Sequence, residues 1–205
     1  MQYFLNNYDR IFSLTIEHVY IILVTLIISL LIAIPIGILI PRIRGLHTPV
    51  LSVLGIMYTI PSLALFALMV PFFGLGFKSA IIALVAYSQM ILVRNIATGM
   101  KNIDPAIIEA ARGMGMGQWR ILWKVEFPLA LPVIIAGIRI ATVAIMGIAA
   151  IAAYINAGGL GEMIFEGIYQ SNATKIIIGT IIIALLTISA DIGLRFAEKK
   201  LSPGV

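Results

Sequence analysis

The chain contains no cysteine and very few charged residues. Without cysteine there is no disulfide framework and no thiolate chemistry to consider. Charged residues make up 11% of the 205 residues, against about a quarter in an average soluble domain. With 61% hydrophobic residues and a mean hydropathy of +1.09, the composition excludes an ordinary soluble domain and indicates a membrane protein.

Long uncharged runs predict where the chain crosses the membrane. A spanning helix needs roughly 20 mainly apolar residues, and the runs reach this length once an interfacial charge is allowed at their ends. The predicted spans are residues 18–40, 49–70, 76–94, 130–154 and 174–194. The expected fold class is an all-α polytopic membrane protein with about five transmembrane helices.

The polar ends of the chain frame one predicted transmembrane domain over residues 18–200. Residues 1–17 form a polar lead, and residues 201–205 form a tail. The first span is too long for the apolar core of a cleaved signal and follows this uncleaved lead, so we expect it to remain as a membrane helix.

Basic residues predict the orientation of the spans. With the N-terminus outside, the inner segments hold ten Lys and Arg residues and the outer segments hold three, and this positive-inside bias favours that placement. The inner ones are Arg42, Arg44, Arg94, Lys101, Arg112, Arg120, Lys124, Arg195, Lys199 and Lys200, and the outer ones are Arg10, Lys78 and Lys175. The C-terminus and the loop of residues 101–128 are then cytoplasmic. Anionic lipid at the inner leaflet accounts for the net charge of +5, so no nucleic-acid partner is expected.

The polar loop between the third and fourth spans predicts a docking element. Asp104 followed by Pro105 is a helix start, because the carboxylate accepts free N–H groups and proline suits the first helical position. A helix of about two turns is expected to end at Gly113. Two alanines, Ala110 and Ala111, keep this helix thin enough to enter a groove. A plain polar loop between two membrane helices is the alternative.

The spacing within this loop resembles the signature of permease subunits of binding-protein-dependent ABC importers. Glu109-Ala110-Ala111 is followed after three residues by Gly115, and after nine more by Val125-Glu126-Phe127-Pro128. Val125 replaces an Ile of the family pattern and Phe127 replaces a Leu. The resemblance implies a type I ABC importer permease fold in which this loop contacts an ATPase. The residues assigned to coupling are Asp104, Glu109, Ala110, Ala111, Gly113 and Gly115.

Further stretches narrow the resemblance to osmoprotectant importers for glycine betaine, carnitine and choline. They are the run from Tyr58 to Leu65, Gly74-Leu75-Gly76, Arg94-Asn95 and Gly158-Gly159-Leu160-Gly161. Methionine-importer permeases share the five-helix plan and a Gly-Gly-Leu-Gly stretch, so permeases for amino acids or other small solutes are the alternative.

Partners and location follow from the same resemblance. It implies a second permease subunit (this chain or a homologue), two ATP-binding subunits and an extracytoplasmic substrate-binding protein. The location is the inner, or cytoplasmic, membrane of a prokaryote. ATP and Mg belong to the partner ATPase; we expect no cofactor, metal or catalytic residue on this chain.

Other classes of protein fit the residues less well. Gly113, Gly115 and Gly117 do not form the dinucleotide fingerprint, because Gln118 follows them and no strand precedes them. No phosphate-binding Gly-Lys-Ser/Thr loop is present. An ATP-independent secondary carrier usually shows inverted repeats and intramembrane ion-site carboxylates, and neither is evident. An intramembrane enzyme lacks a nucleophile–base pair or a metal set in the spans.

Proline in the second span makes that span a candidate part of the transport pathway. Pro61 removes one helix hydrogen bond and is expected to kink the helix near mid-membrane. Ser62 then lies beside the freed backbone. An ordinary kink for packing is the alternative.

Glycines after the fourth span mark a second pathway candidate. Gly158, Gly159 and Gly161 suit an irregular or re-entrant segment, which is tolerated at membrane depth only against protein or a water-filled cavity. Together with Asn156 they form either part of an outer gate or a simple outer turn.

Arg139 is the costliest residue in the chain, because it lies about ten residues into the fourth span, or about 15 Å along the helix. An intramembrane Arg usually faces the protein interior and pairs with a carboxylate. Asp191, near the inner end of the fifth span, is the expected partner in a structural ion pair. A direct substrate role is disfavoured because a guanidinium repels a quaternary ammonium group.

Overall fold

A computed structural model describes residues 7–201 of the chain, and this part is helical with no strand. The helices are α2 (Tyr8–Leu39), α3 (His47–Thr59), α4 (Ser62–Phe73), α5 (Phe77–Lys101), α6 (Pro105–Gly113), α7 (Gln118–Ile121), α8 (Phe127–Ala152), α9 (Leu160–Tyr169) and α10 (Ala173–Leu201). Short helical turns are η1 (Ile40–Arg42), η2 (Leu122–Glu126) and η3 (Ala153–Ile155). Residues 1–6 of the predicted lead and 202–205 of the predicted tail lie outside the described residues.

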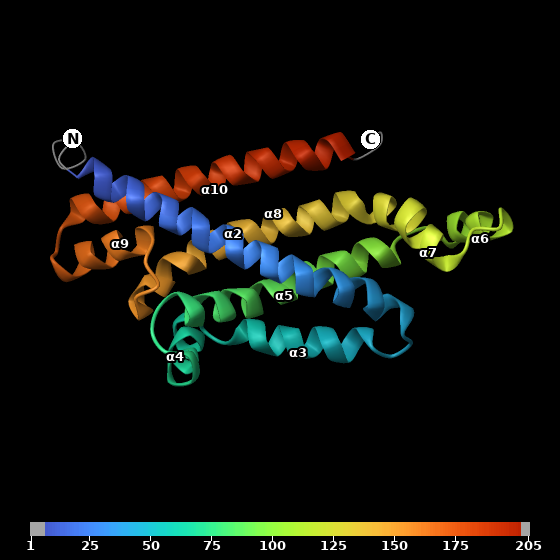
Figure 1. Ribbon diagram of the computed structural model, residues 1–205, viewed down its shortest axis with the longest axis horizontal. Coiled ribbons are helices and arrows are strands. Elements are labelled where there is room, and N and C mark those ends of the chain that lie inside the picture. Colours follow the sequence, from blue (N-terminus) through green and yellow to red (C-terminus); the bar gives the residue numbers. More distant parts are fainter. Residues whose placement is uncertain (1–6, 202–205) are drawn as a thin grey trace.

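The long helices confirm the expected fold class. Four helical stretches of the described chain are long and apolar enough to cross a membrane, and α3 with α4 makes a fifth if this bent pair counts as one span. The four are Tyr8–Arg42, Phe77–Lys101, Gln118–Ile155 and Ala173–Leu201. They lie roughly lengthwise, with α6 and α7 at one end of the molecule and α9 at the other (Figure 1).

The first long helix begins at Tyr8, earlier than the span predicted from residue 18. Ile11 and Leu14 on this extension are buried in a cluster with Leu160 and Met163. Polar residues in this segment interrupt the uncharged run, so composition alone does not predict that the segment packs against protein. The extra helical turns therefore pack against α9.

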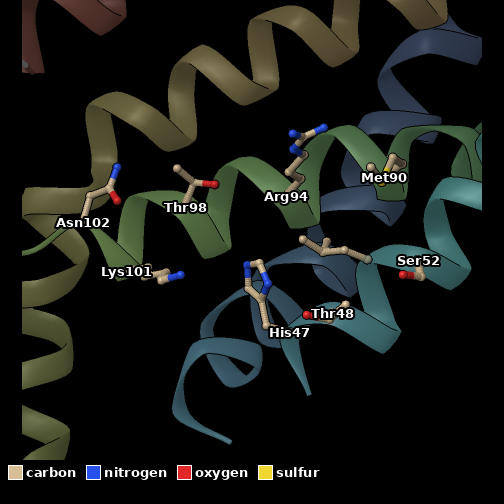
Figure 2. A pocket seen from close by; sticks show the side chains of 9 residues that line it. His47, Thr48, Ser52, Met90, Arg94, Thr98, Lys101 and Asn102 are labelled. Atoms are coloured by element: carbon tan, nitrogen blue, oxygen red, sulfur yellow. The ribbon is translucent and has the colours of Figure 1, made fainter. Parts of the chain in front are cut away.

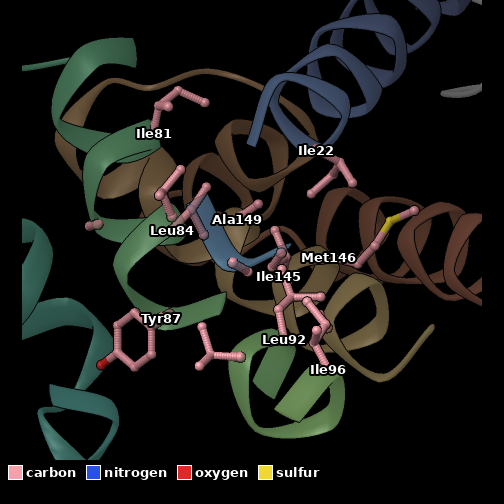
Figure 3. Close-up of a cluster of buried hydrophobic side chains, with 14 of the residues drawn as sticks. Ile22, Ile81, Leu84, Tyr87, Leu92, Ile96, Ile145, Met146 and Ala149 are labelled. Carbon is pink, nitrogen blue, oxygen red and sulfur yellow. The ribbon is translucent and has the colours of Figure 1, made fainter. Parts of the chain in front are cut away.

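The packing core surrounds α5. In its most apolar window 61% of residues are buried, against 6% for α10. Buried side chains of α5, among them Leu84, Leu92 and Ile96, lie in one cluster with Ile145 and Ala149 of α8 (Figure 3). Lipid is as apolar as these side chains, so the stabilisation comes from close packing more than from removal of water.

Small residues allow α2, α5 and α8 to approach one another. A Cβ added to Gly37 of α2 would lie 2.6 Å from the Ile96 side chain of α5. A Cβ on Gly99 of α5 would lie 3.2 Å from the backbone oxygen of Ala130 in α8. Any larger residue would push these helices apart, which is why membrane helix interfaces are rich in small residues.

Buried polar side chains also join α2 to α5. The Ser88 hydroxyl donates to Ser29 Oγ at 2.6 Å, and Gln89 Nε2 donates to the backbone oxygen of Ser29 at 3.3 Å. All three residues are buried. Interhelical hydrogen bonds of this kind contribute about 0.6–2 kcal/mol each in membranes.

The second predicted span is broken, not simply kinked. α3 and α4 meet at an angle of 95°, and Ile60 and Pro61 between them have extended backbone. Proline supplies no N–H to continue the helix. The Tyr87 hydroxyl of α5 donates to the carbonyl oxygen of Ile60, so this acceptor is satisfied by a neighbouring helix, as an interrupted membrane helix requires.

Candidate functional site

The polar loop forms the tip of the molecule, where α6 projects beyond the ends of α5 and α8 (Figure 1). Asp104 Oδ1 accepts a hydrogen bond from the backbone N–H of Ala106 at 2.9 Å. Pro105 occupies the first helical position. The helix start expected from the sequence is therefore present, and it gives the loop a defined shape outside the packed spans.

The residues assigned to coupling lie on two sides of α6. Glu109 and Ala110 are exposed, whereas Ala111 is 2% exposed and packs inward. Gly113 is the last helical residue, and the left-handed turn expected near it falls at Gly115, with φ +78°. The outer side of α6 is consequently free to meet a partner, while its inner side is anchored to the loop.

The second half of the loop is a helical ramp into the fourth span. α7 and the wide turn η2 continue into α8, with Trp119 and Trp123 73% and 46% exposed. Tryptophans favour the headgroup region of a bilayer. Arg42, at the end of the first span, forms an ion pair with Glu126, which ties the ramp directly to α2 and η1.

A groove runs beside α5 from the loop end of the molecule towards the break at Pro61. One cavity of about 520 Å³, lined by His47 and Lys101 among others, lies between α3 and α5 (Figure 2). A second of about 570 Å³, lined by Tyr58 and Ile140 among others, lies between α3, α5 and α8. Ser62, expected in the pathway, is half-buried at the start of α4 and lines neither cavity.

Three residues shared by these cavities were missed as pathway candidates. Met90, Arg94 and Thr98 line both, but the sequence assigned Arg94 only to the orientation signal and to the osmoprotectant resemblance. Their spacing of four residues was the available signal, because it places them on one face of a helix. Periodicity alone does not say whether such a face meets lipid, protein or a cavity.

The glycine segment after α8 is packed into the opposite end of the molecule. Gly158 and Gly159 are buried, with φ +84° and +76°. The N–H of Gly159 donates to Glu17 Oε2 at 2.9 Å, and a Cβ on Gly158 would collide with the same carboxylate. A Cβ on Gly161 would collide with the Ala150 carbonyl. The segment therefore depends on glycine at all three positions.

Asn156 has a structural role at this end. Its backbone is left-handed, with φ +60°, and it ends η3. The carbonyl oxygen of the preceding Ile155 accepts a hydrogen bond from the N–H of Gly76 at 2.7 Å. The Asn156 side chain is exposed. The turn before the glycines is thus joined to the turn between α4 and α5.

The helix that follows, α9, was not predicted as a separate element. It carries two acidic residues, Glu162 and Glu166, that form ion pairs with neighbouring helices. Arg10 Nη2 lies 3.4 Å from Glu162 Oε1 and 2.8 Å from Glu166 Oε2, and Lys175 Nζ lies 2.6 Å from Glu166 Oε1. Hydrogen bonding from Lys175, together with Arg10, lowers the pKa of Glu166 to about 2. These contacts connect α2, α9 and α10.

Arg139 bridges α8 to two acidic residues of α10. Its Nη1 lies 3.2 Å from Asp191 Oδ1, and its Nε lies 3.2 Å from Glu198 Oε2. Asp191 is the partner expected from the sequence, whereas Glu198 was missed. Glu198 follows Asp191 by seven residues, or two helical turns, and this spacing places both on one face.

The described part of the chain holds no group of three or more His, Asp or Glu residues that could bind a metal ion. The two histidines lie apart. His18 is fully buried in α2, and His47 lines the cavity between α3 and α5.

Fold and surface together define a multi-pass membrane subunit with a structured polar tip and a groove leading from it. Residues 33–203 match the family model described as a binding-protein-dependent transport system inner membrane component. This chain belongs to that family.

Curated relatives match over nearly their whole length. The osmoprotectant import permease protein OsmW of Salmonella typhimurium (strain LT2) is 41% identical, covering 99% of this chain and 97% of the relative. A glycine betaine/carnitine/choline transport system permease protein, OpuCB of Bacillus subtilis (strain 168), is 36% identical, with 99% and 94% covered.

Solved structures agree on the fold. The chain superposes on one from the inward-facing MetNI methionine ABC transporter with a TM-score of 0.86 at 23% identity, covering 94% of this chain and 96% of the other. A chain of an amino acid ABC transporter gives a TM-score of 0.77 at 22% identity, with 96% of both covered. At this identity the likeness establishes the type I ABC importer permease fold and nothing about the solute.

Proposed function

We propose that this chain is the membrane-spanning subunit of an ATP-driven importer and forms the pathway for a small osmoprotectant, a quaternary ammonium compound such as glycine betaine, carnitine or choline. The observation that carries the proposal is the extent of the match to OsmW, at 41% identity over 99% of the chain. The relatives named for methionine and amino acids are structural matches below 25% identity, so they do not favour those solutes.

The tip of the molecule is the proposed contact with the ATP-binding subunits. The exposed side of α6 carries Glu109 and Ala110, and its capped start keeps the helix formed without a partner. Two ATPase subunits would bind ATP and Mg, and this chain would contribute no catalytic group or cofactor. Movement of α6 would reach the spans through the ramp of α7 and η2, which is ion-paired to Arg42.

The orientation proposed for this assembly has the N-terminus outside and the loop cytoplasmic, in the inner membrane of a prokaryote. In the structure, α10 runs back towards the end that carries α6, whereas α2 begins beside α9 (Figure 1). This arrangement supports the proposal that the beginning of α2 and the end of α10 lie on opposite sides of the membrane. A substrate-binding protein would dock at the α9 end, and a second permease subunit would complete the pathway.

Uptake measurements on a matched pair of loop glycines test the proposal. Gly115 has φ +78°, whereas Gly117 has φ −70° and an extended backbone, and neither has an atom within 4 Å of an added Cβ. An alanine at position 115 costs about 1–2 kcal/mol of backbone strain, and one at position 117 costs little. Gly115→Ala should therefore disturb the loop where Gly117→Ala does not.

The assay is uptake of labelled glycine betaine by bacteria that lack other osmoprotectant importers and express the chain with its ATP-binding and substrate-binding partners. We expect uptake that requires all components, a clear loss in Gly115→Ala and near-normal uptake in Gly117→Ala, with equal amounts of each variant in the membrane. No osmoprotectant uptake by the complete wild-type system would refute the proposed solute class. Full activity of Gly115→Ala and Gly115→Trp would remove the assigned role of the loop.

A further inference from the structure

The groove beside α5 contains an arginine that has no partner in the described chain. Arg94 lines both cavities and is exposed to them. It forms no hydrogen bond or ion pair with any described residue, whereas Arg10, Arg42 and Arg139 each face a carboxylate. Arg120 and Arg195 also form no ion pair within the described chain, but neither lines these two cavities, whereas Arg94 lines both.

The position of Arg94 in the helix makes an unpaired guanidinium energetically unfavourable unless another group binds it. Arg94 lies seven residues before the end of α5 at Lys101, about 10 Å along the helix. Arginine within or at the end of a membrane span normally faces a water-filled cavity or a paired group. Figure 2 shows its guanidinium projecting from α5 beside the groove that His47 and Thr98 also border.

The remainder of the cavity between α3, α5 and α8 has a different chemistry. Tyr58, Met90, Ile140 and Ala144 line it, and the Tyr58 side chain is 41% exposed. Aromatic rings and polarizable thioethers favour methylated ammonium groups. No acidic residue lines either cavity. One groove therefore contains a guanidinium that can bind an anion and an apolar, aromatic wall that can contact a methylated ammonium group.

We propose that Arg94 binds the carboxylate of a zwitterionic osmoprotectant in this groove, with Tyr58 and Met90 beside the methylated ammonium group. This inference rests on the proposed function and narrows its substrate class to betaines that carry a carboxylate. A guanidinium binds a carboxylate through two parallel N–H···O hydrogen bonds. Choline has the ammonium group but no carboxylate, so Arg94 repels its positive charge and forms no hydrogen-bonded ion pair with it. The residue selects zwitterions over choline.

The experiment uses the complete importer, with its ATP-binding and substrate-binding proteins, in proteoliposomes. Initial uptake of glycine betaine and of choline is measured for wild type, Arg94→Gln and Arg94→Lys, and each rate is divided by the amount of assembled complex. Removal of a charged hydrogen bond should lower glycine betaine uptake about tenfold or more in Arg94→Gln, while choline uptake stays the same or rises. Arg94→Lys should fall between, because it keeps the charge but loses the paired bonds.

Arg195→Gln is the matched control, since Arg195 is an exposed arginine of α10 that lines neither cavity; its uptake ratio should equal that of the wild type. Equal loss of both solutes in Arg94→Gln would overturn the proposal and assign Arg94 to packing, to a carboxylate of the second subunit or to a lipid headgroup. An unchanged ratio would overturn it as well. If Arg94→Gln does not assemble, the ratio in Arg94→Lys decides in the same way. Wild-type importer that takes up neither solute would instead refute the proposed function.

Discussion

Replacing Arg139 with methionine should destabilise the subunit by leaving two carboxylates without their cation. Arg139 lies 3.2 Å from both Asp191 and Glu198, and these three side chains are 22%, 33% and 28% exposed. Methionine keeps much of the length of arginine and preserves packing between α8 and α10. The change therefore isolates the loss of charge.

The expected magnitude lies between two measured limits. Breaking a fully buried ion pair costs about 3–5 kcal/mol, whereas an exposed pair contributes at most about 1 kcal/mol. Since the cluster is mostly but not fully covered, we expect a loss of about 2 kcal/mol in Arg139→Met. Adding Asp191→Leu should recover part of this loss, and adding Glu198→Leu as well should recover most of it, because no unpaired charge then remains.

The assay is reversible unfolding of the purified subunit in mixed SDS and mild-detergent micelles, which gives the free energy of unfolding for each variant. The design is a double-mutant cycle extended to three positions. If the losses of Arg139→Met and Asp191→Leu simply add, the two residues are not coupled. Strict additivity at Glu198 too would refute the ion-pair role of Arg139 and return it to the candidates for the pathway or the subunit interface.

Three further predictions address packing, pH and orientation. Gly161→Ala should abolish assembly, because its Cβ collides with the α8 backbone, whereas Gly147→Ala, with nothing within 4 Å, should assemble normally on size-exclusion chromatography. The pKa of Glu166 is lowered from 4.5 to about 2, so its ion pairs stabilise the fold above pH 4.5 and lose this effect as pH falls towards 2. The thermal stability of the wild type should therefore exceed that of Glu166→Gln at pH 7, and the two should become similar in acid. A difference in thermal stability that does not change with pH would contradict this. Met114→Cys and Tyr169→Cys place thiols at sites that are each 74% exposed; a membrane-impermeant maleimide added outside spheroplasts should label only the second, and the reverse result would invert the orientation.

Composition predicts the spans well because the bilayer imposes a length and an apolarity that few other environments require. The same reasoning fails where protein contacts replace lipid contacts. α9 has apolar residues Leu160, Met163 and Ile164 on one face, a helical pattern, but it is too short to be recognised as a span. The 95° break at Pro61 also exceeds the expected kink, because Tyr87 from another helix holds the opened backbone.

The conformation of the loop could be predicted from the sequence more fully than the groove, for a physical reason. Helix caps and glycine turns depend on the local sequence, so the conformations at Asp104 and Gly115 can be predicted from the adjacent residues. The groove is made by α3, α5 and α8 together, and its lining residues are far apart in the chain. Tyr58 and Arg94 belonged to two separate stretches of the osmoprotectant resemblance, and the structure places both in one cavity.

Ion pairs join several elements of this subunit to their neighbours. Arg42 ties the ramp of the loop to the first span, Arg10 and Lys175 tie α9 to α2 and α10, and Arg139 ties α10 to α8. Within the described chain, α3 has neither a buried residue nor an ion pair. This helix packs on the core through half-buried side chains such as Leu51 and Leu54 and borders the groove of Arg94, so we expect a second permease subunit to cover it.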